Sequence, residues 1–253
     1  MIVATPASKP LLRRRPEPET PAVSHPIVLV PGLNCTAECY AGQVPALWQF
    51  GSVLIPDHKR GSSMAEIAAA ILADAPPTFA LGGFSMGGYI VFEMLRQAPE
   101  RITRLALIDT MARPDAPEQA QNRHDSIRLA EAGKLLQLSA TNFPNAVHPD
   151  NINNAAIRDI SLRMAEQNGA DVYVRQQRAI LSRPDSRPDL ARITVPTTVI
   201  VGEADIITPV DAAHEMADAI PNASLVTIAG AGHMSPTEQP AAVAAALVGW
   251  LKN

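Results

Sequence analysis

The fold of this 253-residue chain is decided by residues 79–88, Phe-Ala-Leu-Gly-Gly-Phe-Ser-Met-Gly-Gly. Residues 79–82 have the apolar composition of a buried strand, and residues 86–97 have a helical pattern. Between them lies a G-x-S-x-G motif, Gly83 to Gly87, in the strand, turn and helix context that it requires. Side chains two residues on either side of Ser85 would collide in so tight a turn, and glycine at both positions removes them. The motif therefore predicts an exposed serine hydroxyl at the end of a strand.

Apolar runs of this kind recur from residue 27 onward and alternate with helical patterns. Strands are expected at residues 27–30, 53–56, 79–82, 105–108, 197–201 and 225–228. Helices are expected at residues 35–50, 64–73, 86–97, 210–219 and 241–251. Thr208-Pro209 and Ser235-Pro236 each predict an N-cap followed by a proline at the first helical position. The alternation is typical of the α/β class, with a mostly parallel, doubly wound sheet of about six strands.

Residues 111–189 interrupt the alternation. This part has polar amphipathic stretches, several prolines and no strand-like run, so we expect a helical cap insertion within one domain of residues 26–253. Because the insertion lies between two strands, it should cover the carboxyl ends of the strands, where α/β sheets bind ligands. Residues 1–25 are rich in proline and arginine, which predicts a poorly ordered basic tail, with a targeting role as the alternative.

A serine hydroxyl is a poor nucleophile at neutral pH, so Ser85 needs a histidine base and a carboxylate that orients this base. Of six histidines, only His233 follows a late strand through a glycine-containing loop and precedes a marked helix start. That position places it at the sheet edge where Ser85 lies. His58 lies on another sheet-end loop, where it could line the pocket, although we expect a solvated side chain.

Two aspartates are candidates for the carboxylate. Asp205 follows the strand at residues 197–201, and Asp109 directly follows the strand at residues 105–108. Both positions are at the carboxyl ends of strands, so Asp109 could be the acid or could cap a loop. The chain order Ser85, Asp205, His233 favours Asp205, because it is the order found with a strand-to-helix serine motif of this kind.

The tetrahedral intermediate formed by such a serine carries an oxyanion, which needs two preorganised donors. These donors are typically backbone N–H groups, and Met86 supplies the first because it directly follows the nucleophile. The second is expected in the loop Pro31-Gly32-Leu33-Asn34, where Gly32 permits close approach and Leu33 is the expected donor.

Together these motifs resemble the α/β-hydrolase superfamily. The resemblance covers about residues 26–252 and rests on residues 30–33, 83–88, 202–205 with Thr208-Pro209, and 230–233. It is specifically to small capped hydrolases that include 3-oxoadipate enol-lactonases, pimeloyl-ester carboxylesterases and cofactor-free haloperoxidases. It implies a Ser85, Asp205 and His233 triad that needs no cofactor. The chain departs from the family at Pro31, where histidine is usual, and before residue 27, where two further strands are usual.

Composition and charge exclude several classes of partner. With 21 basic and 25 acidic residues the net charge is −4, which argues against nucleic-acid binding. No apolar run approaches the roughly 20 residues that span a bilayer, and no secretory signal is visible, so we expect a cytoplasmic protein without a membrane partner. Cys35 and Cys39 lack a second Cys/His cluster, so no metal site is expected.

The expected activity is hydrolysis of a small-molecule carboxylic ester or lactone through an acyl-enzyme on Ser85. Acyl transfer or perhydrolysis on the same triad is the alternative, and a non-catalytic ligand receptor is a further one. Near the end of the insertion, Arg175 and Arg178 would share one face of a helix. If this face looks toward Ser85, the arginines would bind a substrate carboxylate. Otherwise they face solvent or pair with nearby aspartates.

Overall fold

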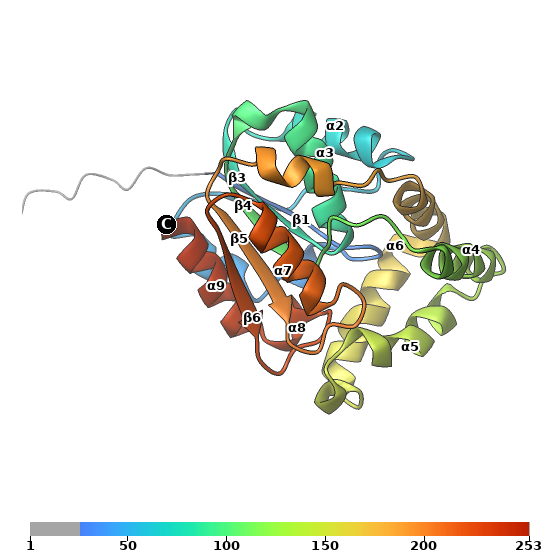
Figure 1. The fold of residues 1–253 in the computed structure, drawn as a ribbon. Helices are drawn as coiled ribbons and strands as arrows, with labels where there is room; N and C mark the ends of the chain where they lie inside the picture. Colours follow the sequence, from blue (N-terminus) through green and yellow to red (C-terminus); the bar gives the residue numbers. More distant parts are fainter. Residues whose placement is uncertain (1–25, 253) are drawn as a thin grey trace, which may run out of the picture.

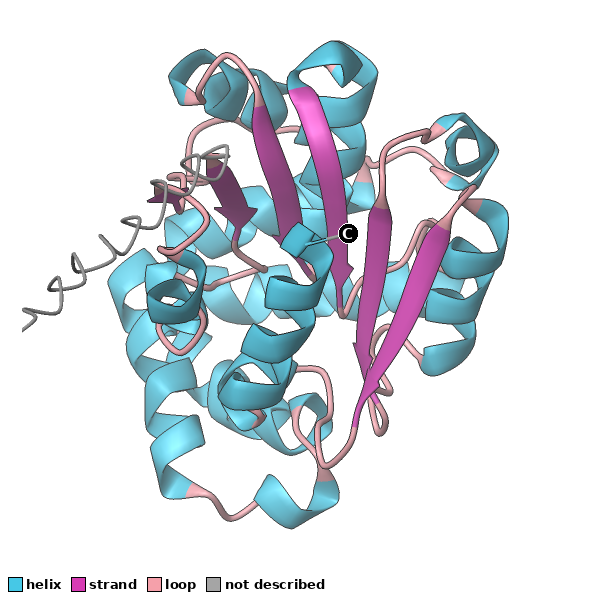
Figure 2. Cartoon of the chain, turned by 90° about the vertical axis from the view of Figure 1, so that its left-hand side faces the viewer, coloured by secondary structure: helices cyan, strands magenta, loops and turns pink. Residues whose placement is uncertain are grey.

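A computed structural model describes residues 26–252. Its centre is a six-stranded sheet in which every neighbouring pair of strands is parallel. The strands are β1 (Ile27–Val30), β2 (Val53–Leu54), β3 (Phe79–Phe84), β4 (Ile102–Ile108), β5 (Thr197–Gly202) and β6 (Ala223–Ile228). Their order is β2-β1-β3-β4-β5-β6, and Figure 2 shows the sheet with helices around it. The expected α/β class with six parallel strands is confirmed.

The order of the strands determines where a ligand site can form. β1 and β3 are neighbours in the sheet, whereas β2, which lies between them in the chain, is at one edge. The chain therefore reverses its direction of travel across the sheet at β1. Such a reversal leaves a crevice outside the carboxyl ends of β1 and β3, and ligands of open α/β sheets bind there.

Alternate residues of each strand point to opposite faces of the sheet. In β1, Val28 and Val30 pack in one hydrophobic cluster, whereas Ile27 and Leu29 pack in the other. All residues of β1, β3 and β5 are buried. The sheet is therefore covered on both faces, as expected for parallel strands with continuous apolar sequences.

Helices on the two faces of the sheet complete these clusters. The first cluster includes side chains of α2 (Met64–Asp74), α3 (Met86–Gln97) and α7 (Val210–Ala219). The second includes side chains of α1 (Val44–Leu47) and α9 (Pro240–Lys252). The helices expected at residues 64–73, 86–97, 210–219 and 241–251 are thus confirmed.

The helix expected at residues 35–50 is wrong. This segment contains a short 3-10 helix, η1 (Ala37–Tyr40), and the single turn α1, which begins after Gln43. Pro45 lies in the first turn of α1. A continuous helix through this point would lack one backbone hydrogen bond, and the proline ring would clash with the preceding turn. The chain therefore turns between the two pieces.

The two expected N-caps are also wrong in detail. Helix α7 begins at Val210 with Pro209 as its N-cap, and α8 (Ser235–Glu238) begins at Ser235 itself. The hydroxyl groups of Thr208 and Ser235 instead form hydrogen bonds with aspartate carboxyl groups. The side chains of Thr208 and Ser235 therefore belong to the hydrogen-bond network of the site described below.

The segment between β4 and β5 is helical. It contains α4 (Pro117–Glu131), α5 (Leu135–Ala146) and α6 (Ala155–Leu181), with no strand among them. Gly169 breaks the helical geometry of α6 with a φ of 75°. Figure 1 shows the three helices grouped together beside the sheet. The remaining short 3-10 helices are η2 (Pro99–Arg101), η3 (Pro149–Asn151) and η4 (Arg187–Arg192).

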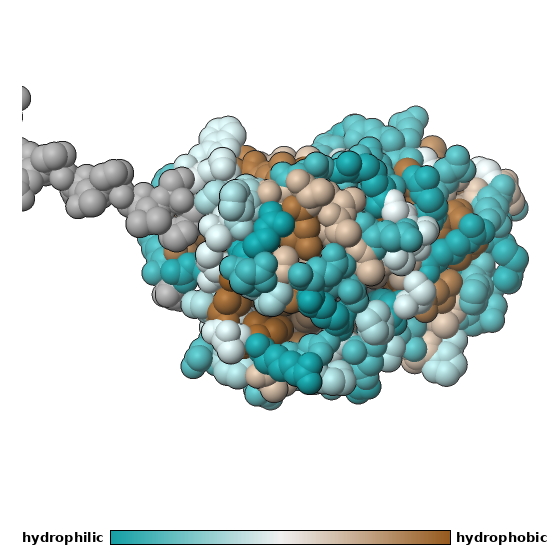
Figure 3. All heavy atoms as spheres, turned by 90° about the horizontal axis from the view of Figure 1, so that it is seen from above, coloured by the Kyte–Doolittle hydropathy of each residue, from teal (hydrophilic) through white to brown (hydrophobic). Residues whose placement is uncertain are grey.

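No helix within residues 26–252 combines the length and apolarity that a bilayer crossing needs. The face shown in Figure 3 is mostly hydrophilic, with apolar residues in separate areas. The expected cytoplasmic location stays a prediction, and the expected tail, residues 1–25, lies outside the described residues.

Candidate active site

Ser85 lies at the sharp turn between β3 and α3. Its φ of 54° and ψ of −117° are rare for a residue with a side chain. A Cβ on Gly83 would lie 2.5 Å from the carbonyl oxygen of Gly87, and a Cβ on Gly87 would lie 2.2 Å from that of Val30. The turn therefore requires glycine at both positions, for the steric reason that the motif indicates.

Ser85, His233 and Asp205 form a continuous hydrogen-bonded chain. They lie on loops that follow β3, β6 and β5. The Oγ of Ser85 lies 2.8 Å from Nε2 of His233, and Nδ1 of His233 lies 2.9 Å from Oδ2 of Asp205. An ionised carboxylate can only accept hydrogen bonds, so Nδ1 carries the proton and Nε2 accepts one from the serine hydroxyl. The structure thus brings together three residues separated widely in the chain.

The loop after β5 holds the Asp205 carboxylate. Oδ1 accepts hydrogen bonds from the backbone N–H groups of Ile207 at 2.8 Å and Thr208 at 3.0 Å. Oδ2 accepts one from the Thr208 hydroxyl at 2.7 Å. Burial raises the pKa of Asp205, but the charge of His233 and the hydrogen bonds from His233 and Thr208 outweigh it, so the pKa is lowered. The carboxylate is therefore ionised at neutral pH.

The pKa of His233 shifts in the opposite direction. Burial lowers it, but the negative charge and hydrogen bond of Asp205 raise it by more, with a smaller contribution from Asp109. The net effect raises the pKa above its ordinary value of 6.5. An imidazole in this site is thus a stronger base than a free one, and the imidazolium that forms after proton transfer is stabilised.

Asp109, the alternative acid, contacts neither Ser85 nor His233. Its Oδ1 accepts a hydrogen bond from the backbone N–H of Gly202 at 2.8 Å, and its Oδ2 accepts one from the Ser235 hydroxyl at 2.5 Å. Burial, and next the charge of Asp205, raise the pKa of Asp109 well above its ordinary value of 3.8. Through these two hydrogen bonds Asp109 connects the end of β4 with the end of β5 and with the start of α8.

The two expected oxyanion donors are Leu33 and Met86, and both line the cavity next to Ser85. Neither backbone N–H donates a hydrogen bond to another group of residues 26–252. Asn34, the residue after Leu33, does have a partner for its backbone N–H, which donates to Oε1 of Gln176 on α6 at 2.9 Å. Two unoccupied donors thus lie beside the serine, and α6 holds in place the loop that carries one of them, Leu33.

His58 supports this loop. The expectation of a solvated side chain is wrong, because His58 is only 3% exposed. Its Nε2–H donates to the Gly32 carbonyl at 2.9 Å, and the N–H of Cys35 donates to the same oxygen at 3.2 Å. Burial lowers the pKa of His58, so the ring is neutral at pH 7. Since the Gly32 carbonyl and the Leu33 N–H belong to one planar peptide unit, these bonds set the direction of the N–H.

A cavity of about 430 Å³ opens over Ser85. Its walls come from the loops after β1, β3, β5 and β6 and from α4, α5 and α6. Apolar side chains such as Phe84, Leu138 and Phe143 line it, together with amides, hydroxyls and one guanidinium, that of Arg123. No aspartate or glutamate is among its lining residues. The cavity can therefore hold a small organic molecule with its reactive group at Ser85.

The structure corrects the expectation for Arg175 and Arg178. They share one face of α6 as expected, but this face points outward and both residues are exposed. Arg175 donates to the backbone carbonyl of Lys59, and Arg178 pairs with Glu131. Gln176 and Gln177 are buried instead. Because each helical residue turns by about 100°, the buried glutamines and the exposed arginines occupy different sides of α6.

Glu238 connects the His233 loop with the segment after α5. Its Oε1 accepts a hydrogen bond from the backbone N–H of Gly232 at 2.8 Å. Its Oε2 accepts from the backbone N–H of His148 at 2.6 Å and from Nδ2 of Asn151 at 2.9 Å. A buried carboxyl group with three donors fixes both segments, so it contributes to the position of His233.

His58, Gln176 and Glu238 were not selected from the sequence for the site. A buried polar residue breaks the apolar pattern without showing its partner, because the partner comes from another segment. The one available signal was the position of Glu238, in the first turn of the helix that follows His233.

Metal binding was tested on the described part of the chain. Within residues 26–252 no group of three or more His, Cys, Asp or Glu side chains is arranged to hold a metal ion. Cys35 and Cys39 are both buried free thiols. The expectation that the site works without a cofactor stays a prediction.

The chain was compared with known proteins. A family model described as the alpha/beta hydrolase family matches residues 27–246. A Mycobacterium tuberculosis protein provisionally named as the non-heme bromoperoxidase BpoC is 27% identical over 245 residues, covering 88% of this chain and 92% of the relative. The structure of a thermophilic esterase from Thermogutta terrifontis, with malate bound, is 28% identical with a TM-score of 0.83, covering 90% and 89%. The fold is also similar to the enol-lactonase from Burkholderia xenovorans LB400, at 24% identity and a TM-score of 0.81, covering 91% and 92%.

Proposed function

The chain belongs to the alpha/beta hydrolase family, and from this premise we propose that it is a serine hydrolase that cleaves small carboxylic esters or lactones. The observation that carries the proposal is the chain of hydrogen bonds from Ser85 through His233 to Asp205, at 2.8 Å and 2.9 Å. A serine held in this arrangement at the base of a cavity can act as a nucleophile.

In the first half of the reaction, the Oγ of Ser85 attacks the substrate carbonyl while its proton passes to Nε2 of His233. The carbonyl oxygen becomes an oxyanion, and the Leu33 and Met86 N–H groups donate to it. The intermediate then collapses: the bond to the leaving oxygen breaks, and this oxygen takes the proton from His233. An acyl-enzyme on Ser85 and a free alcohol result, or a hydroxy-acyl chain when the substrate is a lactone.

In the second half, His233 takes a proton from water as the water oxygen attacks the acyl carbonyl. The same two N–H groups hold the second oxyanion. Collapse breaks the bond to Oγ, which recovers its proton from His233, and a carboxylic acid leaves. Asp205 remains ionised throughout, keeps the proton on Nδ1 and stabilises the imidazolium in both halves.

His58 is a positioning residue in this mechanism. It does not line the cavity, but it fixes the Gly32 carbonyl and thereby the peptide unit that contains the Leu33 N–H. A donor that is already aimed at the oxyanion costs no reorganisation during the reaction. The mechanism thus depends on a histidine that never touches the substrate.

The substrate is enclosed by the segment of residues 111–189, which we propose is a cap. Its helices α4, α5 and α6 supply Arg123, Phe143 and Tyr173 to the cavity wall opposite the sheet. A wall made by an insertion determines the size and polarity of the substrate, while the chemistry remains on the loops of the sheet.

Active-site labelling tests the proposal. A fluorophosphonate probe should label the wild type on Ser85 and leave Ser85→Ala unlabelled, because His233 activates this serine alone. The matched control is Ser139→Ala, since Ser139 lines the same cavity and has no hydrogen bond to a histidine. The control should label like the wild type, and both should hydrolyse short acyl esters or lactones, which Ser85→Ala should not. Equal labelling of Ser85→Ala would overturn the mechanism.

Perhydrolysis is the second candidate function, and the similarity to a protein named as a bromoperoxidase favours it. In this reaction hydrogen peroxide replaces water in the attack on the acyl-enzyme, and a peracid leaves instead of a carboxylic acid. Peracid formation in acetate or propionate with hydrogen peroxide, compared with ester hydrolysis by the same preparation, separates the two. Ser85→Ala should abolish both, since the two reactions share one acyl-enzyme.

A further inference from the structure

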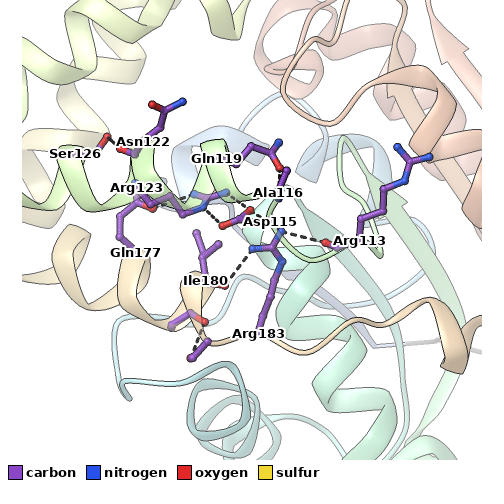
Figure 4. A network of polar contacts seen from close by, with 12 residues as sticks. Arg113, Asp115, Ala116, Gln119, Asn122, Arg123, Ser126, Gln177, Ile180 and Arg183 are labelled. Carbon is purple, nitrogen blue, oxygen red and sulfur yellow. Dashed lines mark hydrogen bonds and ion pairs between the residues drawn. The ribbon is translucent and has the colours of Figure 1, made fainter.

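Arg123, on α4, brings a fixed guanidinium group to the cavity. Its Nε donates to Oδ2 of Asp115 at 2.6 Å and its Nη2 to Oδ1 of Asp115 at 3.3 Å. Its Nη1 donates to Oε1 of Gln177 on α6 at 2.9 Å. Figure 4 shows these groups pointing toward one another between α4 and α6. The side chain is 17% exposed, so it reaches the cavity while most of its surface is packed.

The positive charge of this cluster exceeds its negative charge. Asp115 also accepts a hydrogen bond from Nη2 of Arg183 at 2.8 Å, so one carboxylate is shared by two guanidinium groups. Burial raises the pKa of Asp115, but hydrogen bonds from Arg183 and Arg123 lower it by more, and the carboxylate is ionised. Arg183 is buried over the ring of Tyr89, with its Cζ 4.3 Å from the ring centroid. One carboxylate and two guanidinium groups leave a net charge of +1 at the cavity wall.

Nothing else in the cavity neutralises this charge, because no aspartate or glutamate lines it. Arg123 also keeps donors free: a guanidinium has five N–H groups, and three are used by Asp115 and Gln177. Tyr173 also lines the cavity, and its hydroxyl oxygen accepts a hydrogen bond from Nε2 of Gln177 at 2.7 Å. A guanidinium held by two partners, with spare donors, is a preorganised site for an anion.

We propose that this part of the cavity binds a carboxylate of the substrate, while the ester or lactone carbonyl of the same molecule lies at Ser85. The substrate class is then half-esters of dicarboxylic acids, or lactones that carry a carboxylate. This inference rests on the proposed hydrolase function and narrows it. In this proposal Arg123 determines specificity, and its guanidinium is positioned by Gln177 and Asp115. Arg183 adds a second positive charge, and the single carboxylate of Asp115 cannot neutralise both arginines.

The first test measures binding without chemistry. Calorimetric titration of Ser85→Ala with glutarate and adipate should show binding, and adding Arg123→Gln should weaken it by roughly 10- to 100-fold, the range for a charge-assisted hydrogen-bonded pair. Arg128→Gln is the matched control, because Arg128 is an exposed arginine of the same helix and pairs with Asp125. The control should bind like Ser85→Ala alone. Equal affinity in Arg123→Gln, or no binding by any protein, overturns the proposal even when the protein hydrolyses esters.

The second test uses turnover. The wild type should have a higher kcat/KM for the 4-nitrophenyl monoester of glutaric acid than for 4-nitrophenyl pentanoate, which has the same chain length without the carboxylate. Arg123→Gln should lose this preference, and its circular dichroism spectrum and melting temperature, matched to those of the wild type, should show that it folds. Arg123→Lys keeps the charge without the bidentate geometry and should retain part of the preference. A wild type that prefers pentanoate overturns the subsite whatever the variants do, whereas a wild type that cleaves no ester overturns the hydrolase function instead.

Discussion

Oδ2 of Asp109 lies 2.5 Å from the hydroxyl oxygen of Ser235, two residues beyond His233. The carboxyl group of Asp109 thus holds the segment that follows His233 and forms no hydrogen bond with His233 itself. Asp205 contacts the imidazole directly, at 2.9 Å. Two aspartates at equivalent strand ends therefore have different partners, and we expect them to respond differently to the same substitution.

Asp205→Asn should lower kcat by about 10³- to 10⁴-fold, because the amide cannot keep the proton on Nδ1 of His233 or stabilise the imidazolium. Asp109→Asn should lower it by less than about tenfold, since the amide oxygen can still accept the hydrogen bond from the Gly202 N–H and the amide NH2 can donate to the Ser235 hydroxyl. Steady-state kinetics of both variants with one ester gives the ranking. The reverse order would assign the role of the acid to Asp109.

The pH dependence of kcat/KM should show a base whose pKa is above 6.5. Burial lowers the pKa of His233, but Asp205 raises it by more, so the net shift is upward. Only the neutral imidazole can accept the serine proton. Activity should therefore fall as the pH falls through the raised pKa. In Asp205→Asn the midpoint should move to lower pH, measured as the rate of fluorophosphonate labelling, because the stabilising negative charge is absent. A wild-type midpoint below 6.5 would contradict the assignment.

His58→Ala should lower kcat by about 10- to 100-fold with little change in KM, because the Leu33 N–H would lose its fixed direction toward the oxyanion. His58→Gln, whose amide N–H can still reach the Gly32 carbonyl, should recover part of the rate. The control is His124→Gln, since His124 is exposed on α4. A rise in KM alone, or equal loss in His58→Ala and His58→Gln, would limit His58 to a structural role.

Two glycine substitutions should have opposite effects on stability. Gly87→Ala places a Cβ 2.2 Å from the backbone oxygen of Val30 and should reduce the free energy of unfolding by about 2–3 kcal/mol or more. Gly249→Ala lies in α9, where an added Cβ has no neighbour within 4 Å. It should raise the free energy of unfolding by about 0.5–1 kcal/mol, through the better helix propensity of alanine. Thermal denaturation followed by circular dichroism measures both, and a neutral Gly87→Ala would show that the turn can relax.

The sequence alone was sufficient for the sheet and for the position of Ser85. Parallel strands covered on both faces need continuous apolar runs, which local composition reveals. The tight turn needs Gly83 and Gly87 for a steric reason that does not depend on the rest of the chain. Asp205 and His233 were found because parallel strands end at one edge of the sheet, so a residue after any strand lies near the others.

The sequence was insufficient to predict which way a helix face points or where a helix is interrupted, because both depend on packing against other segments. Arg175 and Arg178 share a face, as their spacing indicates, but only packing determines that this face points to solvent. The helix expected at residues 35–50 was broken by Pro45, whose effect depends on the turn before it.

The tertiary structure alone decided what surrounds the serine. The role of His58 depends on a contact with Gly32, 26 residues earlier, and that of Gln176 on Asn34, 142 residues earlier. The proposed role of Arg123 depends on the tertiary structure, because folding places Asp115 where it pairs with both Arg123 and Arg183. Buried polar groups must be paired because water is excluded from them, and the pairing is made across segments whose separation in the chain carries no information about their distance in space.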